Sequence, residues 1–306
     1  MKMNALVPFF VMLRPVVLAT AIAVLVPLLT SPVSAQDQAA IERGRYLYTA
    51  AGCEGCHTDI KNKGEKLAGG RALVTPFGTY YGPNITPDKQ HGIGNWTDAQ
   101  FIRALRDGVS PSGEHYFPVF PYTSFTKMTD RDMLDIKAYI FSLPPVARAD
   151  TPHDIKFPFG FRFTMIGWKM LFLDKGPMQP DPAHDEQWNR GAYLTRAAAH
   201  CGECHTERNF LGAVRKDREL GGSPVGPEGG SVPNITPGGR NVGQWSAEEI
   251  AEVLSSGLTP DGDSVSNGMD EVVANTGKLT ESDRMAIAVF MKSLPPVQLP
   301  PRAAKN

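Results

Sequence analysis

The sequence lacks an excess of charge of either sign. Its 306 residues include 31 lysines and arginines against 32 aspartates and glutamates. Proteins that bind nucleic acid usually carry a basic excess, so this near balance argues against nucleic acid as a partner. Hydrophobic residues make up 42% of the chain, which is too many for a disordered protein and enough for a packed core. The length predicts two domains.

Other patterns are also missing or scarce. The sequence has no glycine-rich nucleotide-binding pattern and no Ser-His-Asp arrangement. Strand-like alternation of apolar and polar residues is scarce, so we expect a mainly α fold. Cysteine is rare, with four residues, whereas glycine and proline are plentiful and predict long loops between short helices.

Residues 1–35 have the pattern of a secretory signal. Arg14 precedes an uncharged run over residues 15–30, and Val33-Ser34-Ala35 supplies the small residues that precede a cleavage site. The run is short for a membrane span. We therefore expect an exported protein of the periplasm. A retained N-terminal anchor is the alternative, which would attach the protein to the outer face of the cytoplasmic membrane.

The remaining chain contains one pattern twice. The repeated pairs are 43–47 with 190–194, 53–58 with 201–206, 83–87 with 233–237, Trp96 with Trp245, and 142–146 with 293–297. The offset between the copies varies only from 147 to 151 residues. Such self-similarity indicates a duplicated domain. We expect domains at residues 36–147 and 188–306, joined by an aromatic- and proline-rich connector at residues 148–187.

Matching cap signals predict matching helices in the two copies. Thr97 and Ser246 each precede a Gln or Glu at capping-box spacing, and the helices that follow should end at Gly108 and Gly257. A second pair of helices should open at the Thr-x-x-Asp sequences 129–132 and 280–283 and end at Pro-Pro. In the opening helices, Gly44 and Gly191 suit a close crossing of two backbones.

Each copy carries Cys-x-x-Cys-His, the attachment sequence of c-type haem. Cys53 and Cys56, and likewise Cys201 and Cys204, could each add to a haem vinyl group, and the adjacent His57 or His205 would face the iron as its proximal ligand. A redox dithiol or half of a zinc site is the alternative. Export would favour disulfides, but no cysteine remains outside the two motifs. We therefore expect two covalently bound haem c groups.

Over nearly the whole mature chain, the sequence resembles class I cytochrome c domains. It resembles more closely a family of exported multihaem cytochromes that includes the electron-transfer subunits of membrane-associated alcohol and gluconate dehydrogenases. The resemblance extends to 84–88, 120–124 and 188–194. It implies two tandem class I cytochrome c domains and a dehydrogenase partner. The alcohol and gluconate members have three such domains and this chain has two, so direct quinone chemistry is not expected here.

The resemblance implies a distal methionine from the loop before the last helix of each domain. In the second domain this is Met269. In the first, the matching family position holds Phe120, which cannot ligate iron, and Met128 is the substitute. Its aligned counterpart, Leu279, leaves a packing role open for Met128. The other candidates for a distal ligand here are His115 and, less favoured, His91, whereas Met133 should pack inside the final helix.

The repeated Pro-Asn-Ile-Thr-Pro sequence is a candidate part of each haem site. The resemblance implies that a proline carbonyl oxygen accepts a hydrogen bond from the proximal histidine, and Pro83 and Pro233 are the candidates. Asn84 and Asn234 could reach haem propionates. The alternative is a rigid turn in which each asparagine serves the backbone.

Residues 157–173, within the connector, are rich in phenylalanine and other large apolar side chains. We expect them to pack as a clamp between the domains. Docking to a dehydrogenase subunit and contact with a membrane are the alternatives, because an exposed stretch of this composition would be a liability.

These features predict a periplasmic cytochrome that passes single electrons from a dehydrogenase to a respiratory or soluble redox protein. Methionine ligands would leave no vacant iron site, so no catalytic residues are expected. The alternative is a dihaem enzyme, of the peroxidase or thiosulfate-oxidising type, in which one iron has an open distal site. Phe120 keeps that alternative open.

Overall fold

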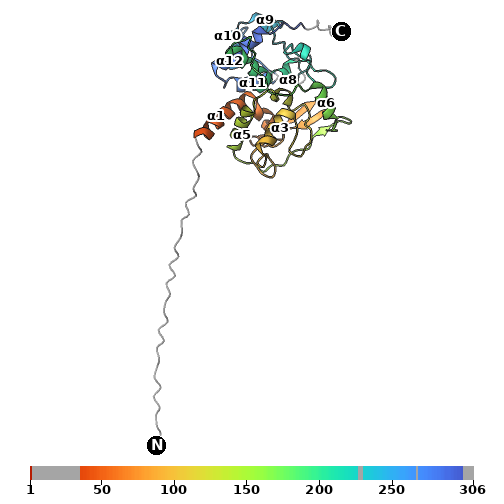
Figure 1. Ribbon diagram of the computed structural model, residues 1–306, viewed down its shortest axis with the longest axis vertical. Coiled ribbons are helices and arrows are strands. Elements are labelled where there is room, and N and C mark those ends of the chain that lie inside the picture. The colour runs from red at the N-terminus through yellow and green to blue at the C-terminus, as the bar shows by residue number, and fades with distance from the viewer. Residues whose placement is uncertain (2–34, 227–229, 267, 299–306) are drawn as a thin grey trace. The chain divides into compact units, whose positions relative to one another are not determined.

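A computed structural model describes Met1 and residues 35–226, 230–266 and 268–298. It divides the chain into two units, Met1–Ser34 and Ala35–Asn306, and the helices and strands described below belong to the second (Figure 1). The predicted secretory signal lies outside the described residues, apart from its two end residues. Among the described residues, no helix is long and apolar enough to cross a membrane.

Helices predominate, which confirms the expected mainly α fold. In the first half they are α1 (Ala35–Ala50), α2 (Cys53–His57), η1 (Ile60–Asn62), α3 (Asp98–Asp107), α4 (Tyr122–Phe125) and α5 (Asp130–Phe141). The connector forms α6 (Thr164–Phe172). The second half contains α7 (Glu186–Tyr193), η2 (Leu194–Ala198), α8 (Gly202–His205), η3 (Lys216–Arg218), α9 (Arg240–Gln244), α10 (Ala247–Ser256), α11 (Met269–Thr276) and α12 (Glu281–Ser293).

A small antiparallel sheet, which the sequence analysis did not predict, is formed by two strands of the first half and one of the connector. Its order is β1 (Ala72–Thr75), β2 (Gly78–Tyr81) and β3 (Asp154–Ile155). Thr79 pairs with Val74 on one side and Asp154 on the other. The strands are too short for a clear alternating pattern. Because β3 comes from the connector, the connector is joined to the first half by backbone hydrogen bonds.

The predicted caps are confirmed in both halves. The Thr97 and Ser246 hydroxyls accept the amides of Gln100 and Glu249, whose side chains bond back to the cap amides, so both capping boxes are complete. Helices α3 and α10 end at glycines 108 and 257, both in the left-handed conformation. Thr129 and Thr280 cap α5 and α12 through the amides of residues 132 and 283.

The close helix crossings are confirmed too. In each half the opening helix packs on the last helix, α1 on α5 and α7 on α12. A Cβ atom on Gly44 would collide with the carbonyl of Asp135, and one on Gly191 with the carbonyl of Ala286. The absence of a side chain therefore lets the two backbones touch.

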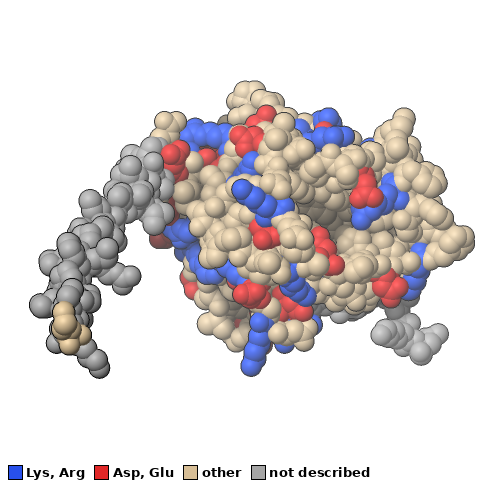
Figure 2. Space-filling model, turned by 90° about the horizontal axis from the view of Figure 1, so that it is seen from below, with Lys and Arg blue, Asp and Glu red and all other residues tan. Residues whose placement is uncertain are grey.

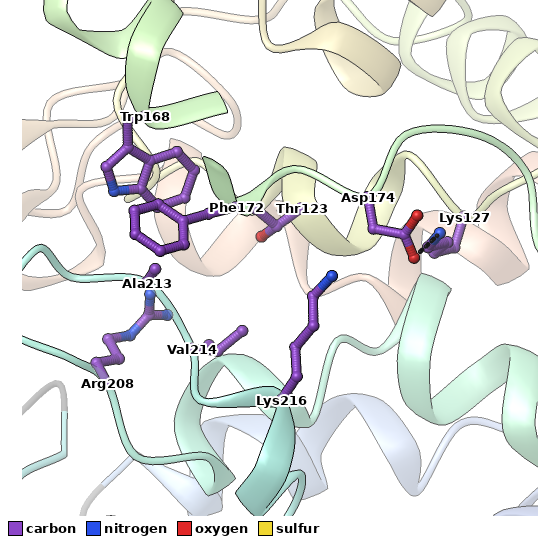
Figure 3. Close-up of a pocket in the computed structure, with 9 residues that line it drawn as sticks. All are labelled: Thr123, Lys127, Trp168, Phe172, Asp174, Arg208, Ala213, Val214 and Lys216. Atoms are coloured by element: carbon purple, nitrogen blue, oxygen red, sulfur yellow. Dashed lines mark hydrogen bonds and ion pairs between the residues drawn. The ribbon is translucent and has the colours of Figure 1, made fainter. Parts of the chain in front are cut away.

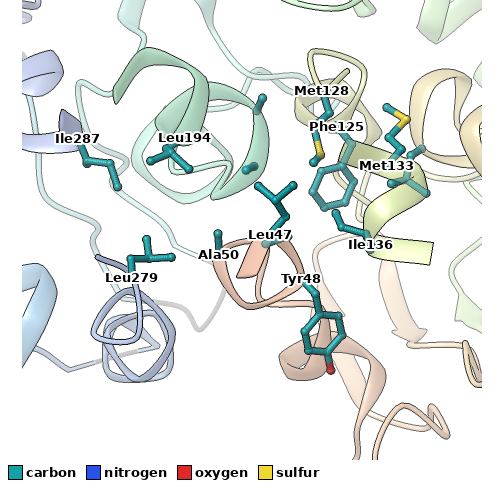
Figure 4. Packing of buried hydrophobic residues seen from close by; sticks show 14 of the residues in the cluster. Leu47, Tyr48, Ala50, Phe125, Met128, Met133, Ile136, Leu194, Leu279 and Ile287 are labelled. Carbon is teal, nitrogen blue, oxygen red and sulfur yellow. The ribbon is translucent and has the colours of Figure 1, made fainter. Parts of the chain in front are cut away.

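One hydrophobic core runs through both halves. It includes Leu47 of α1, Phe125 and Ile136 of the first half, and Leu194 and Ile287 of the second. Figure 4 shows Leu47 between the side chains of the two halves. The surface in Figure 2 has acidic and basic side chains interspersed. The halves thus repeat one fold and bury their apolar faces together.

Candidate haem-attachment sites

The first site is built around helix α2. Gly52 turns the chain with a φ of 60° just before Cys53. Cys53 is half-buried and Cys56 exposed, and both thiols are free. His57 Nδ1 lies 2.8 Å from the carbonyl oxygen of Pro83. A carbonyl only accepts, so Nδ1 carries the proton, and Nε2 is left with the lone pair that a metal requires.

The second site repeats this geometry around helix α8. Cys201 and Cys204 are free and half-buried. His205 is buried, and its Nδ1 donates to the Pro233 carbonyl at 2.8 Å, the same distance as in the first site. The residues therefore fit a covalently bound haem in both halves: two free thiols and an imidazole with a defined tautomer.

A second set of bonds holds the backbone at each histidine, where helices α2 and α8 end. In the first half the Gly69 amide donates to the His57 carbonyl at 2.8 Å, and the Leu67 amide donates to the Thr58 hydroxyl at 3.0 Å. In the second half the corresponding bonds are Gly222 to His205 at 2.7 Å and Leu220 to Thr206 at 3.0 Å. In each half, hydrogen bonds thus hold both the imidazole ring of the histidine and the backbone next to it.

Electrostatics distinguish these cysteines from a reactive dithiol. Burial and the neighbouring thiol raise the pKa of Cys53 to about 12 and that of Cys201 to about 12. Redox Cys-x-x-Cys motifs depend on a lowered thiol pKa, so the raised values disfavour that alternative. Burial lowers the pKa of both His57 and His205, although their bonds to proline carbonyls oppose it. The neutral imidazole, which is the ligand form, is therefore favoured.

The two sites are near each other. Burial, Glu203 and also Cys56 of the other half raise the pKa of Cys204 to about 11. Arg71 donates to the Gly55 carbonyl inside the first motif and to Glu271 of the second half, both at 2.7 Å.

Among the described residues, no group of three or more His, Cys, Asp or Glu side chains could hold a metal ion.

His200, immediately before Cys201, is a residue that the sequence analysis missed. Its Nε2 lies 3.1 Å from the Ala51 carbonyl, and its ring packs against Phe125 with the ring centroids 5.4 Å apart. It therefore touches the first half just before that half's motif. Comparing the two copies could not reveal this residue, because its counterpart in the first copy is Gly52.

The asparagines of the repeated turn serve the backbone. Asn84 Nδ2 donates to the carbonyls of Val146 and Arg148 at 2.8 and 2.9 Å, and Oδ1 accepts from the Thr86 amide and hydroxyl. Asn234 donates to Val297 and accepts from residue 236 in the same way. Both side chains are buried. These bonds favour a rigid turn over contact with propionates.

The distal candidates differ in their surroundings. Met269 begins α11, is half-buried and packs against the core. Met128 is fully buried in the same core as its counterpart Leu279, and Figure 4 shows its side chain beside Phe125. Met133 is buried within α5, as expected. Met128 therefore occupies a packed core position like that of Leu279, whereas Met269 is partly accessible.

The other first-half candidates have partners of their own. Phe120 packs in a cluster of rings with Tyr116 and Phe125, both at 5.7 Å between centroids. His115 Nδ1 lies 3.1 Å from Lys169 Nζ of the connector. The His91 amide donates to Asp88 of its own loop at 2.6 Å, whereas His91 Nδ1 lies 3.4 Å from that carboxylate and makes no hydrogen bond among the described residues.

The expected connector clamp is only partly right. Trp168 is buried, and its indole nitrogen donates to the Leu211 carbonyl of the second half at 2.9 Å. Figure 3 shows Trp168 and Phe172 beside Ala213 at the edge of a small cavity that all three line. Many large apolar side chains of α6 and its approach are exposed, however. They are Phe157, Phe159, Phe161, Phe163, Ile166, Met170 and Leu171. One side of the connector packs between the halves, and the other faces solvent.

Comparisons with known proteins agree with this geometry. A cytochrome c family model matches residues 41–144. The chain is 48% identical over 263 residues to a diheme cytochrome c-type protein of Cereibacter sphaeroides, covering 84% of this chain and 86% of that protein. It is 37% identical to the fructose dehydrogenase cytochrome subunit of Gluconobacter japonicus, covering 87% of this chain and 54% of that one.

A third relative is a nicotinate dehydrogenase subunit of Pseudomonas putida, 41% identical over 281 residues. The match covers 90% of this chain and 23% of that relative. The chain therefore spans about half or less of the length of these two dehydrogenase subunits. Its similarity to the Cereibacter protein runs through nearly the full length of both. The chain thus belongs to the c-type cytochromes, in the group that contains diheme cytochromes and cytochrome subunits of dehydrogenases.

Proposed function

We propose that the chain is a periplasmic dihaem cytochrome that receives single electrons from a dehydrogenase and passes them to a respiratory or soluble redox protein. The observation that carries this proposal is the pair of histidines, each after two free thiols and each with Nδ1 at 2.8 Å from a proline carbonyl. Two equivalent sites in one core suit transfer between them.

Haem iron would supply a centre that changes oxidation state by one electron. The four cysteines would tether the two groups, and His57 and His205 would ligate the irons through Nε2. The Pro83 and Pro233 carbonyls hold the imidazole rings in orientation. Met269 and Met128 would complete the ligation and exclude other reagents from the irons.

The relatives suggest the class of electron donor. Their names include nicotinate, fructose, alcohol and gluconate dehydrogenase subunits. A dehydrogenase for a sugar, an alcohol or a carboxylic acid is therefore the proposed donor. Residues 1–35 would direct export. After export this segment would either be cleaved off or stay as an anchor to the outer face of the cytoplasmic membrane.

The proposal is tested by purifying the chain from its native host. The mature protein should have the mass of the polypeptide cleaved before residue 36 plus two haems, stain for haem on a denaturing gel and be fully reducible by dithionite. A polypeptide without haem would refute the proposal, and one haem would refute the two-site version. Fractionation of the cells tests the location.

A dihaem enzyme is the second candidate. Two observations favour it: the first half has Phe120 at the expected ligand position, and Met128 is buried like Leu279. An open iron in that half would bind carbon monoxide or cyanide rapidly and show a high-spin ferric spectrum. Two low-spin haems that resist both reagents support the electron carrier.

A further inference from the structure

An exposed apolar surface lies on the outer side of the connector. We call it the connector face and define it by Phe157, Phe163, Met170, Leu171 and Phe210, whose exposed fractions are 85, 69, 82, 73 and 87%. The segments that carry these residues are in contact. Phe161 joins Phe157 and Phe163 through ring contacts at 6.1 and 5.8 Å, and Trp168 of α6 donates to the carbonyl of Leu211, the residue after Phe210.

Within residues 157–173, the two cations, Arg162 and Lys169, point away from this face. Lys169 is buried and donates to the carbonyls of Asp107 and Gly108 at 2.7 and 2.6 Å. Arg162 donates to the His115 carbonyl at 3.0 Å and lies 4.9 Å from the Phe117 ring centroid. Residues 157–173 contain no acidic side chain and no other cation. The outward surface of this segment is therefore almost uncharged.

This charge pattern indicates the kind of partner. Surfaces that bind anionic membranes combine apolar tips with outward lysines and arginines. The core of a protein–protein interface is instead depleted of charge and rich in aromatic residues and methionine. The connector face, with three phenylalanines, a methionine and a leucine, resembles the core of a protein–protein interface. A matching partner surface would be apolar and uncharged.

Packed rings lead from Phe172, the residue after Leu171 of the connector face, to His200, which lies beside both attachment motifs. Centroid distances between successive rings are 5.3, 6.3, 6.4, 5.7 and 5.4 Å along Phe172, Trp168, Tyr122, Phe120, Phe125 and His200. His200 precedes Cys201 and contacts the Ala51 carbonyl, two residues before Cys53. A protein bound at this face would thus be connected to both sites through the packed interior.

We propose that the connector face docks the electron-donating dehydrogenase subunit through an uncharged apolar surface of that subunit. This inference rests on the proposed function. The chain belongs to a group that includes cytochrome subunits of dehydrogenases. A dehydrogenase subunit is therefore the partner that this proposal names. The five large apolar side chains would then be exposed only in the free protein, because the partner covers them in the complex.

The test is photo-crosslinking in the native host. The full chain carries p-benzoylphenylalanine in place of Phe163 or Phe210, and in place of Leu258 as the matched control, which is 54% exposed in the second half. Adducts are identified by mass spectrometry. A dehydrogenase catalytic subunit joined at residues 163 and 210, and absent at 258, is the expected result. A second copy of the chain, a phospholipid, an unrelated protein or no adduct overturns the proposal.

A charged substitution sharpens the result. Met170→Glu should lower the yield of the adduct at residue 163 roughly tenfold or more, because it places a charge in the centre of an apolar interface. Leu258→Glu should leave the yield unchanged, and an unchanged yield with Met170→Glu would overturn the docking site. Haem content and dithionite reduction of the same proteins report separately on the proposed function. A redox-active dihaem protein without the adduct refutes the docking face alone.

Discussion

Tyr46, on the opening helix of the first half, donates a hydrogen bond to Asp283 on the last helix of the second half, at 2.6 Å. Its hydroxyl also accepts from the Thr280 amide at 3.0 Å. The repeat does the same in reverse, since Tyr193 donates to Asp132 and accepts from the Thr129 amide. Each half thus supplies a tyrosine that completes the helix cap of the other.

Removing one of these hydroxyls should destabilise the protein. The Asp283 carboxylate is buried and also accepts two hydrogen bonds from Arg190. Tyr46→Phe therefore removes a charge-assisted hydrogen bond from a buried carboxylate. We expect a loss of about 1.5–3 kcal/mol in the free energy of unfolding, and a similar loss for Tyr193→Phe. Denaturant unfolding of the haem-loaded protein measures both.

The control is Tyr81→Phe, because Tyr81 is a half-buried tyrosine on the β-sheet, outside the caps. A cost for Tyr46→Phe no greater than that of the control would contradict a stabilising role for the exchanged tyrosines.

The helix crossing in the second half gives a steric prediction. Gly191→Ala would place a methyl group against the Ala286 carbonyl and the Phe290 side chain. We expect a cost of about 1–3 kcal/mol or more, because the backbones of α7 and α12 must separate. Gly167→Ala is the matched control, since Gly167 lies in α6 with open space around it. The control should be neutral or stabilising by up to about 1 kcal/mol. Thermal unfolding of both variants decides.

The sequence predicted the features that are local or repeated. The caps at Thr97 and Ser246 depend on residues three positions apart, and the duplication identified both histidine motifs. Contacts between the halves were beyond prediction, because a repeat tells which residues are equivalent but not which copy they face. The exchanged partners of Tyr46 and the contact of His200 with Ala51 are of this kind. The connector was misjudged because composition cannot tell which side of a segment packs.

Lys169 gives a pH prediction. Burial lowers its pKa to about 8 from an ordinary 10.5, with Asp107 opposing the shift and Arg103 adding to it. Between these values the unfolded chain binds more protons than the folded chain, so this group makes stability rise with pH from about 8 to 10.5. The difference in unfolding free energy between the natural protein and Lys169→Met should therefore move in favour of the natural protein across that range. A difference that stays flat, or that falls with pH, would contradict the shift.

The distal ligands give the last prediction. Met269→Leu should remove one methionine ligand, halve the near-infrared methionine–iron band and create a high-spin haem. Met128→Leu should do the same in the other half. Met133→Leu, in the same buried environment as Met128, should leave the band intact. All three substitutions conserve volume and should each cost less than about 1.5 kcal/mol in packing, so spectral changes report on ligation. If Met128→Leu keeps the full band, Met128 packs as Leu279 does, and the first site must take another ligand or remain open to reagents, as the dihaem enzyme requires.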